Sequence, residues 1–276
     1  MPKRSSVAPG VSLRFGRRFT GWLLHDGWLS VCAVIAGVAL WEALHVFHIV
    51  PPDLLPGPGD VWRALMDMLA NGYRDTTLSQ NVFATLYRCA AGFLLACLTG
   101  IPLGVAMGRD ARMGAAFDYI IQFMRPLPPL SYLVLLILWL GTGNTSKIAL
   151  LYLTAFPIIT SSAMAGVRNV QVQKVQAARS LGANEWQVFR YVALPSALPL
   201  IFSGARIAAA VAFSTVVAAE LMAATDGLGW MVFSASHFLR NDIILLGIIV
   251  LGILGMLLNH GILLIDRAVV HWRGVD

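Results

Sequence analysis

Four ionisable side chains lie within long apolar stretches of this sequence, where a charge is costly unless it has a function or a partner. They are Arg88, Arg125, Arg206 and Glu220. An arginine in such a place can hold an anion through charge-assisted hydrogen bonds. The four residues are therefore candidates for lining a path for a small polar or anionic solute. The structural alternatives are that an arginine snorkels to the surface or that the charges pair with one another.

These side chains differ in their surroundings. Glu220 lies near one end of its apolar stretch, where it could gate a path, cap backbone amides, or pair with Arg88 or Arg125. Arg206 is fourteen residues earlier in the same stretch. That spacing is about 21 Å along a helix, which is too far for a direct pair. Arg125 precedes a proline cluster, and non-helical backbone at membrane depth must be buried in protein or face water. The segment 125–129 is therefore expected either to border the path or to serve packing.

Metal, nucleophile and nucleotide chemistry is not indicated. The six histidines show no His-x-x-x-His or Cys–His spacing, and the three cysteines lie in apolar runs without a disulfide or metal pattern. A phosphate-binding loop would need G-x4-G-K-[ST], and the nearest string, residues 141–148, departs from it. The Ser, His and Asp residues form no nucleophile elbow. We expect neither a catalytic residue nor a metal ligand.

The composition determines the class of protein. Hydrophobic residues make up 58% of the 276 residues and charged residues 12%, and the mean hydropathy is +0.73. Soluble domains run at about 45–50% apolar and about 25% charged. An ordinary soluble enzyme, a disordered chain and a fibrous protein are therefore excluded. The sequence predicts an all-α polytopic membrane protein.

A span of the bilayer needs about 20 mostly apolar residues, and six segments meet that requirement. The third of them is interrupted by Pro126, Pro128 and Pro129. The expected transmembrane helices cover residues 28–50, 82–107, 117–140, 148–167, 200–225 and 243–265.

The basic residues predict the orientation of these spans. Alternate connecting segments hold 13 of the 20 Lys and Arg residues, and the intervening segments hold 4. Basic residues gather on the cytoplasmic side, so both termini are expected there. The same bias explains the net charge of +6 without a nucleic-acid partner. The basic segments are 1–27, 108–116, 168–199 and 266–276; the others are 51–81, 141–147 and 226–242.

The largest cytoplasmic segment, 168–199, predicts a helix–turn–helix. Apolar residues recur every three positions from Val172 to Leu181, and Gly182 is a typical helix stop. Asn184 with Gln187 three residues later matches a capping box for the next helix. Two prolines, at 195 and 199, are expected to end that second helix. The pair could pack on its own bundle or dock a cytoplasmic partner.

The same segment resembles a known motif. Gln176-Ala177-Ala178, Gly182 and Leu194-Pro195 keep the spacing of the EAA loop in the permease subunits of binding-protein-dependent ABC importers. Gln176 replaces the usual Glu, and Val192 replaces the usual Ile. The first change removes one carboxylate that could contact the ATPase, but the helix–turn–helix is unaffected. The resemblance covers about residues 78–265.

The resemblance implies a type I ABC importer permease fold. In that fold, the contact of this chain with a separate ATPase subunit would involve Gln176, Ala177, Ala178, Gly182 and Ala183. It implies a separate ATPase dimer that holds ATP and Mg, a second permease copy as a homodimer, and an external solute-binding protein. The chain would hold no cofactor, would not be an enzyme, and would be a multi-pass protein of the bacterial inner membrane, surrounded by lipid.

The layout and the solute also follow from the resemblance. The stretches 125–130, 140–147 and 217–231 resemble importers of taurine, other aliphatic sulfonates and nitrate, with taurine the leading expectation and nitrate left open. A secondary carrier or a membrane-embedded enzyme would be the alternatives from other classes. The expected parts are a tail at 1–27, a first span and outer loop at 28–77, the importer domain at 78–265 with its coupling loop at 168–199, and a tail at 266–276.

Overall fold

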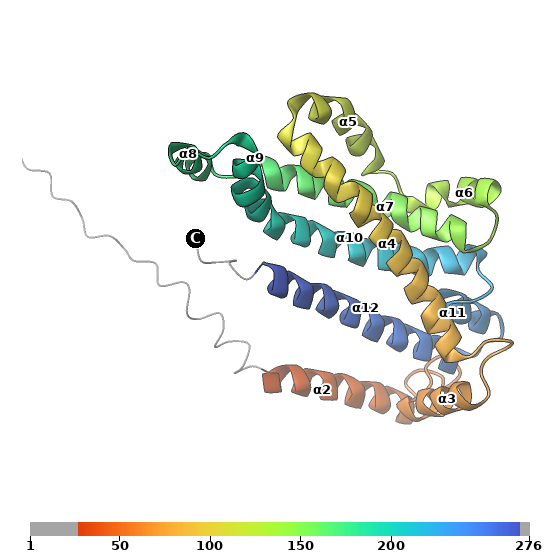
Figure 1. Cartoon of the computed structure of the whole chain (residues 1–276). Coiled ribbons are helices and arrows are strands. Elements are labelled where there is room, and N and C mark those ends of the chain that lie inside the picture. The colour runs from red at the N-terminus through yellow and green to blue at the C-terminus, as the bar shows by residue number, and fades with distance from the viewer. Residues whose placement is uncertain (1–26, 271–276) are drawn as a thin grey trace, which may run out of the picture. The chain divides into compact units, whose positions relative to one another are not determined.

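The computed structural model describes residues 27–270, and these residues are almost entirely helical (Figure 1). Within them, the isolated bridge between Tyr73 and Thr76 is the one β contact. Most of the two predicted tails, residues 1–26 and 271–276, lies outside the described residues. The chain divides into two compact units, one ending at Gly59 and the other beginning at Asp60.

The first unit contains α2 (Gly27–Val46) and the loop that follows it. Trp41 Nε1 donates a hydrogen bond of 2.9 Å to Pro56 O, and His45 Nδ1 lies 3.1 Å from Leu55 O. These bonds fold the proline-rich loop back onto the end of α2. The apolar side chains of α2 are exposed along its length, as expected for a helix whose solvent is lipid.

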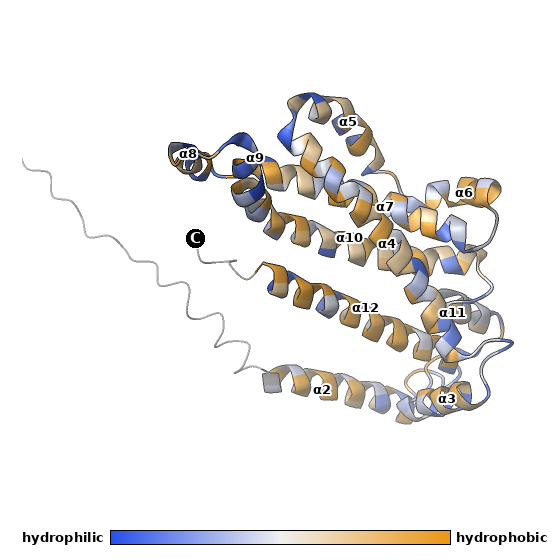
Figure 2. Cartoon of the chain, viewed as in Figure 1, coloured by the Kyte–Doolittle hydropathy of each residue, from blue (hydrophilic) through white to orange (hydrophobic). Residues whose placement is uncertain are grey.

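The helices from α3 onward begin at the boundary between the units. They are α3 (Pro58–Ala70), α4 (Leu78–Arg109), α5 (Ala111–Met124), α6 (Leu133–Leu140), α7 (Asn144–Arg168), α8 (Val172–Ser180), α9 (Glu185–Val188), α10 (Leu194–Ala223), α11 (Leu228–His237) and α12 (Asn241–Val269). Four of them, α4, α7, α10 and α12, are long and apolar, whereas α8 and α9 carry mainly hydrophilic residues (Figure 2).

Within residues 27–270, five helical stretches are long and apolar enough to cross a membrane: α2, α4, α7, the continuous stretch Glu185–Ala223 and α12. A sixth span is possible if α5 and the 129–140 segment count as one, although they meet at an angle of 93°. The six predicted spans are present in this sense. The expected interruption of the third is confirmed, because the prolines from Pro126 to Pro129 stop α5 and start a short 3₁₀ helix, Pro129–Tyr132.

The helices α4, α7 and α10 form the centre of the second unit, where their small residues allow close packing. A Cβ at Gly104 would lie 2.3 Å from Thr160 O, and one at Gly108 would lie 2.7 Å from the Cβ of Val167. Gly104 and Gly108 therefore allow α4 to lie close against α7. The core cluster consists of Cys89, Ala96, Leu151, Ala155, Ile159, Ala208, Ala212 and Val216.

Candidate functional site

Residues 172–188, called the elbow here, form two short helices joined by a turn at Gly182. The amide of Ala183 donates to Ala178 O at 3.1 Å, and the amide of Gly182 donates to Arg179 O at 2.9 Å. This pair of bonds is a Schellman motif, which needs a left-handed residue after the helix. Gly182 supplies it with φ of +84°. The predicted helix–glycine–helix is confirmed.

The second helix of the elbow begins with the predicted capping box. The amide of Gln187 donates to Asn184 Oδ1 at 2.9 Å, and the amide of Asn184 donates to Gln187 Oε1 at 2.8 Å. An exposed ion pair of 2.8 Å between Arg179 and Glu185 crosses the turn. The direction of the chain through the elbow is therefore determined by several local bonds.

The prediction that Pro195 and Pro199 end the second helix is wrong. The helix continues from Glu185 to Ala223. A π-helical turn, Phe189–Ala193, lies just before Pro195, and the amide of Leu194 donates to Phe189 O five residues back. Such a widened turn accommodates the proline ring, which would clash with a carbonyl in a regular α-helix. The second helix of the elbow and α10 are consequently one continuous rod.

The elbow leaves apolar side chains exposed. Leu181 is 88% exposed, Val172 63% and Trp186 60%. Gln176 and Ala177 are exposed, whereas Ala178 and Ala183 are half-buried. Among residues 27–270, the elbow does not bury this apolar surface against its own bundle. Exposed apolar side chains flanked by polar residues are typical of a surface that docks a partner.

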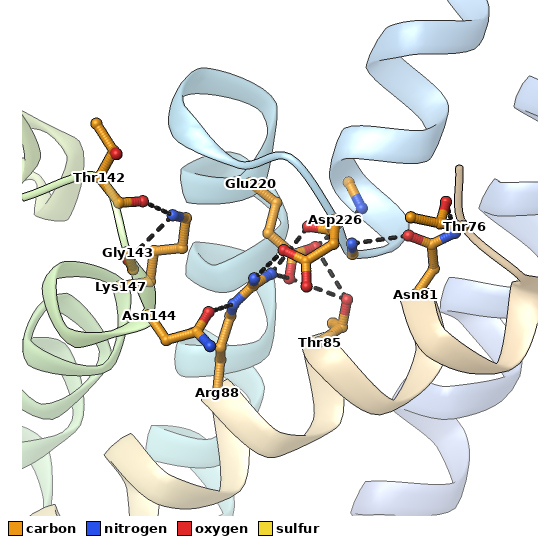
Figure 3. Close-up of polar contacts among 12 residues, drawn as sticks. Thr76, Asn81, Thr85, Arg88, Thr142, Gly143, Asn144, Lys147, Glu220 and Asp226 are labelled. Carbon is orange, nitrogen blue, oxygen red and sulfur yellow. Dashed lines mark hydrogen bonds and ion pairs between the residues drawn. The ribbon is translucent and has the colours of Figure 1, made fainter. Parts of the chain in front are cut away.

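A cluster of charged side chains lies near the opposite end of α10, and Figure 3 shows their contacts. Glu220 is 26 residues after Leu194, which is about 39 Å along a helix. Arg88 Nη1 donates to Glu220 Oε1 at 2.7 Å, and both side chains are at most 2% exposed. Of the possibilities weighed for Glu220, the structure shows pairing with Arg88 and capping of a backbone amide.

Arg88 is the centre of this charge cluster, which we define as Arg88, Glu220 and Asp226. Its Nε donates to Asn144 Oδ1 at 2.8 Å, at the start of α7. Its Nη1 also donates to Asp226 O at 2.9 Å, and its Nη2 pairs with the Asp226 carboxylate. Asp226 lies in the connection between α10 and α11, so Arg88 joins α4 to both α7 and that connection.

The other partners of Glu220 anchor the start of α11. Glu220 accepts hydrogen bonds from Thr85 Oγ1 and from the amide of Gly229, at 2.9 Å each. Thr85 Oγ1 accepts from the amide of Leu228 at 2.9 Å, and Asn81 Oδ1 accepts from the amide of Gly227 at 2.8 Å. Three successive amides are thus satisfied by side chains from α4 and α10. Unsatisfied amides at this depth would be costly.

Several members of this arrangement were missed in the sequence analysis. Asn81, Thr85 and Arg88 follow a spacing of i, i+4 and i+7, which places them on one face of α4. That polar spacing in an otherwise apolar span is the signal that could have found Asn81 and Thr85. Lys147 was counted as a loop residue, but it is 2% exposed and donates to Thr142 O at 2.6 Å and Gly143 O at 3.1 Å.

Arg125 and Arg206 lie outside the charge cluster. Arg125 is exposed at the end of α5. Arg206 Nη2 pairs with Asp266 Oδ2 on α12 at 3.0 Å. A hollow of about 420 Å³ lies between the start of the 3₁₀ helix and α10. It is lined by Pro129, Leu130, Ala210, Val211, Ser214, Thr215 and Ala218.

Comparison with known proteins agrees with this geometry. Residues 100–273 match the family described as "Binding-protein-dependent transport system inner membrane component". The chain is 42% identical over 247 residues to the taurine transport system permease protein TauC of Escherichia coli, covering 89% of this chain and 90% of TauC. It is 31% identical to SsuC of Bacillus subtilis, which is named for transport of aliphatic sulfonates, over 99% of this chain and 95% of SsuC.

The fold also has a solved counterpart. A chain of the MetNI methionine ABC transporter, in an inward-facing conformation, superposes with a TM-score of 0.61. The alignment covers 70% of this chain and 95% of that chain at 23% sequence identity. This likeness supports the type I importer permease fold.

Proposed function

Because the chain belongs to the family of inner membrane components of binding-protein-dependent transport systems, we propose that it forms the translocation path for a small aliphatic sulfonate, with taurine as the first candidate. It is a multi-pass transport subunit of the bacterial inner membrane and not itself an enzyme. The names of its relatives TauC and SsuC support the choice of a sulfonate.

The continuity of the elbow with α10 is the observation that carries the coupling mechanism. The stretch Glu185–Ala223 has 39 residues, which is about 58 Å of helix. A subunit that moves the elbow therefore moves a rod that reaches the charge cluster. We place an ATPase dimer, with its ATP and Mg, against the exposed elbow residues around Gln176, Ala177 and Gly182. In this orientation the elbow and both termini are cytoplasmic.

The hollow beside α10 is our candidate for part of the path. Apolar side chains line most of it, the hydroxyls of Ser214 and Thr215 are its polar groups, and no charged residue lines it. A site with few strong charges releases its solute readily, which a transport pathway requires. We also propose that two copies of the chain together form the path. Selection of the solute would then rest with an external binding protein.

Reconstitution of the chain with its ATPase and binding protein in proteoliposomes tests the proposal. We expect ATP-dependent uptake of radiolabelled taurine, with no uptake by the chain alone. A short alkanesulfonate should compete with taurine, and nitrate should not. Competition by nitrate would reassign the solute, and uptake without ATP would contradict the importer mechanism in favour of a secondary carrier.

A further inference from the structure

Arg88 pairs with two carboxylates, of which one is buried and the other is partly exposed. The Glu220 side chain is 0% exposed and that of Arg88 is 2% exposed, whereas the Asp226 side chain is 41% exposed. One guanidinium therefore holds two carboxylates in very different surroundings. The two ion pairs should differ in how readily they open.

We expect the ion pair between Arg88 and Glu220 to stay formed. Both oxygens of Glu220 accept hydrogen bonds, from Arg88 and Thr85 on α4 and from the amide of Gly229. Opening this pair would leave the fully buried Glu220 carboxylate without its counter-charge, which costs far more than opening an exposed pair. The pair serves as the fixed part of the cluster.

The Arg88–Asp226 pair can open without such a penalty. Asp226 lies in the connection between α10 and α11, and its carboxylate already reaches water. If the pair opens, Asp226 becomes fully hydrated and Arg88 retains Glu220 as its counter-charge. Only the Asp226 side of this pair is exposed, but Arg88 keeps its bonds to Glu220 and Asn144 when the pair opens, so opening costs less than it does for the Arg88–Glu220 pair.

We propose that Asp226 is a latch on Arg88 that holds this end of the bundle closed and is released as the transporter opens there, while the Arg88–Glu220 pair remains intact. This inference rests on the proposed function, in which the cluster lies at the outer end of the path. Arg88 also binds Asn144 at the start of α7. Release of Asp226 therefore frees the part of the connection before Gly227 from α4 and α7, while the amides of Gly227 and Leu228 stay bound to α4. Asp226 acts here as a positioning residue, through Arg88.

The first test measures the latch in the full chain alone, in lipid nanodiscs. Spin labels at Phe83→Cys on α4 and Thr225→Cys in the connection, after Cys→Ala replacement at positions 32, 89 and 97, report the distance between the two elements. Both labelled residues are exposed. We expect Asp226→Asn to add a longer-distance population, larger by about threefold to fivefold than in the unmodified background. The matched control is Asp75→Asn, an exposed aspartate outside the cluster, which should leave the distances unchanged.

The second test measures the consequence in the assembled importer. If the latch favours the closed outer end, Asp226→Asn should raise ATP hydrolysis in the absence of the binding protein, because loss of the latch shifts the population toward the state that is open at the outer end, in which the ATPase pair is closed. Its melting temperature should stay near that of the parent, whereas Glu220→Gln should lower the melting temperature clearly. A scaffolding role alone would not raise the ATPase rate.

The outcomes separate the latch from the proposed function. The latch is overturned if Asp226→Asn and Asp75→Asn give the same distance distributions, or if Asp226→Asn lowers the melting temperature as much as Glu220→Gln. If the parent chain recruits no ATPase, the proposed function fails, and the distance measurement still decides whether Asp226 releases.

Discussion

Arg88 Nη1 and Glu220 Oε1 lie 2.7 Å apart, although 132 residues separate them in the sequence. This pair joins α4 to α10 at a depth where both side chains are inaccessible to water. It also orders the α10–α11 connection, because Arg88 holds Asp226 and Glu220 accepts from the amide of Gly229.

Removal of one partner of this pair should destabilise the protein strongly. Arg88→Met leaves Glu220 buried without its cation, at a cost of about 3–5 kcal/mol. We expect a large fall in the melting temperature of the protein in nanodiscs, measured by intrinsic fluorescence. The double variant Arg88→Met with Glu220→Met should recover part of the loss, since no buried charge remains. If the double variant loses more stability than the two single variants lose together, the ion pair is not the main source of the effect.

A side chain at Gly227 should disrupt the same region. Its φ is +108°, and a Cβ there would lie 2.4 Å from the Glu220 carboxyl carbon, so Gly227→Ala combines backbone strain with a clash. We expect an appreciable loss of thermal stability and of uptake. Gly252→Ala in α12 is the matched control, because no atom lies within 4 Å of its added Cβ. Equal stability of the two variants would contradict the described packing around Glu220.

The turn at Gly182 offers a test of coupling that spares the bundle. Pro fixes φ near −65°, whereas the turn needs φ of +84°. Gly182→Pro should abolish ATP-dependent uptake while the protein still inserts, and Ala178→Arg should do the same. Gly182→Asn should retain much of the activity, since Asn tolerates the left-handed region. Full uptake by Gly182→Pro with a normally bound ATPase would show that the elbow does not transmit motion.

The exposed arginine at the break in the third span provides a test of the path. If Arg125 borders the path and attracts an anion, Arg125→Ala should reduce uptake several-fold, mainly through a weaker apparent affinity of the transporter for taurine. Arg125→Lys should restore part of it, because it keeps the charge. Concentration-dependent uptake measurements distinguish affinity from maximal rate. Unchanged kinetics in Arg125→Ala would assign this residue a structural role.

Local features of the sequence were sufficient for the elbow. Gly182, Asn184 and Gln187 lie within six consecutive residues, and their bonds form between near neighbours. The end of the second helix was predicted wrongly because proline was taken as a stop. In the π-helical turn before Pro195, an amide donates to the carbonyl five residues back instead of four. The rule that proline ends a helix does not take such a turn into account.

The sequence by itself determined that this protein is a bundle of apolar helices, the approximate positions of its long spans, and the turn of the elbow, because hydropathy, helix periodicity and capping depend on residues close together in the chain. Only the tertiary structure decided which charges meet. From the sequence, Glu220 could pair with Arg88 or with Arg125, and the structure shows that Arg88 has partners on α7, on α10 and in the connection after α10. Their meeting depends on how α4, α7 and α10 cross, which small residues such as Gly104 control through contacts between distant parts of the chain.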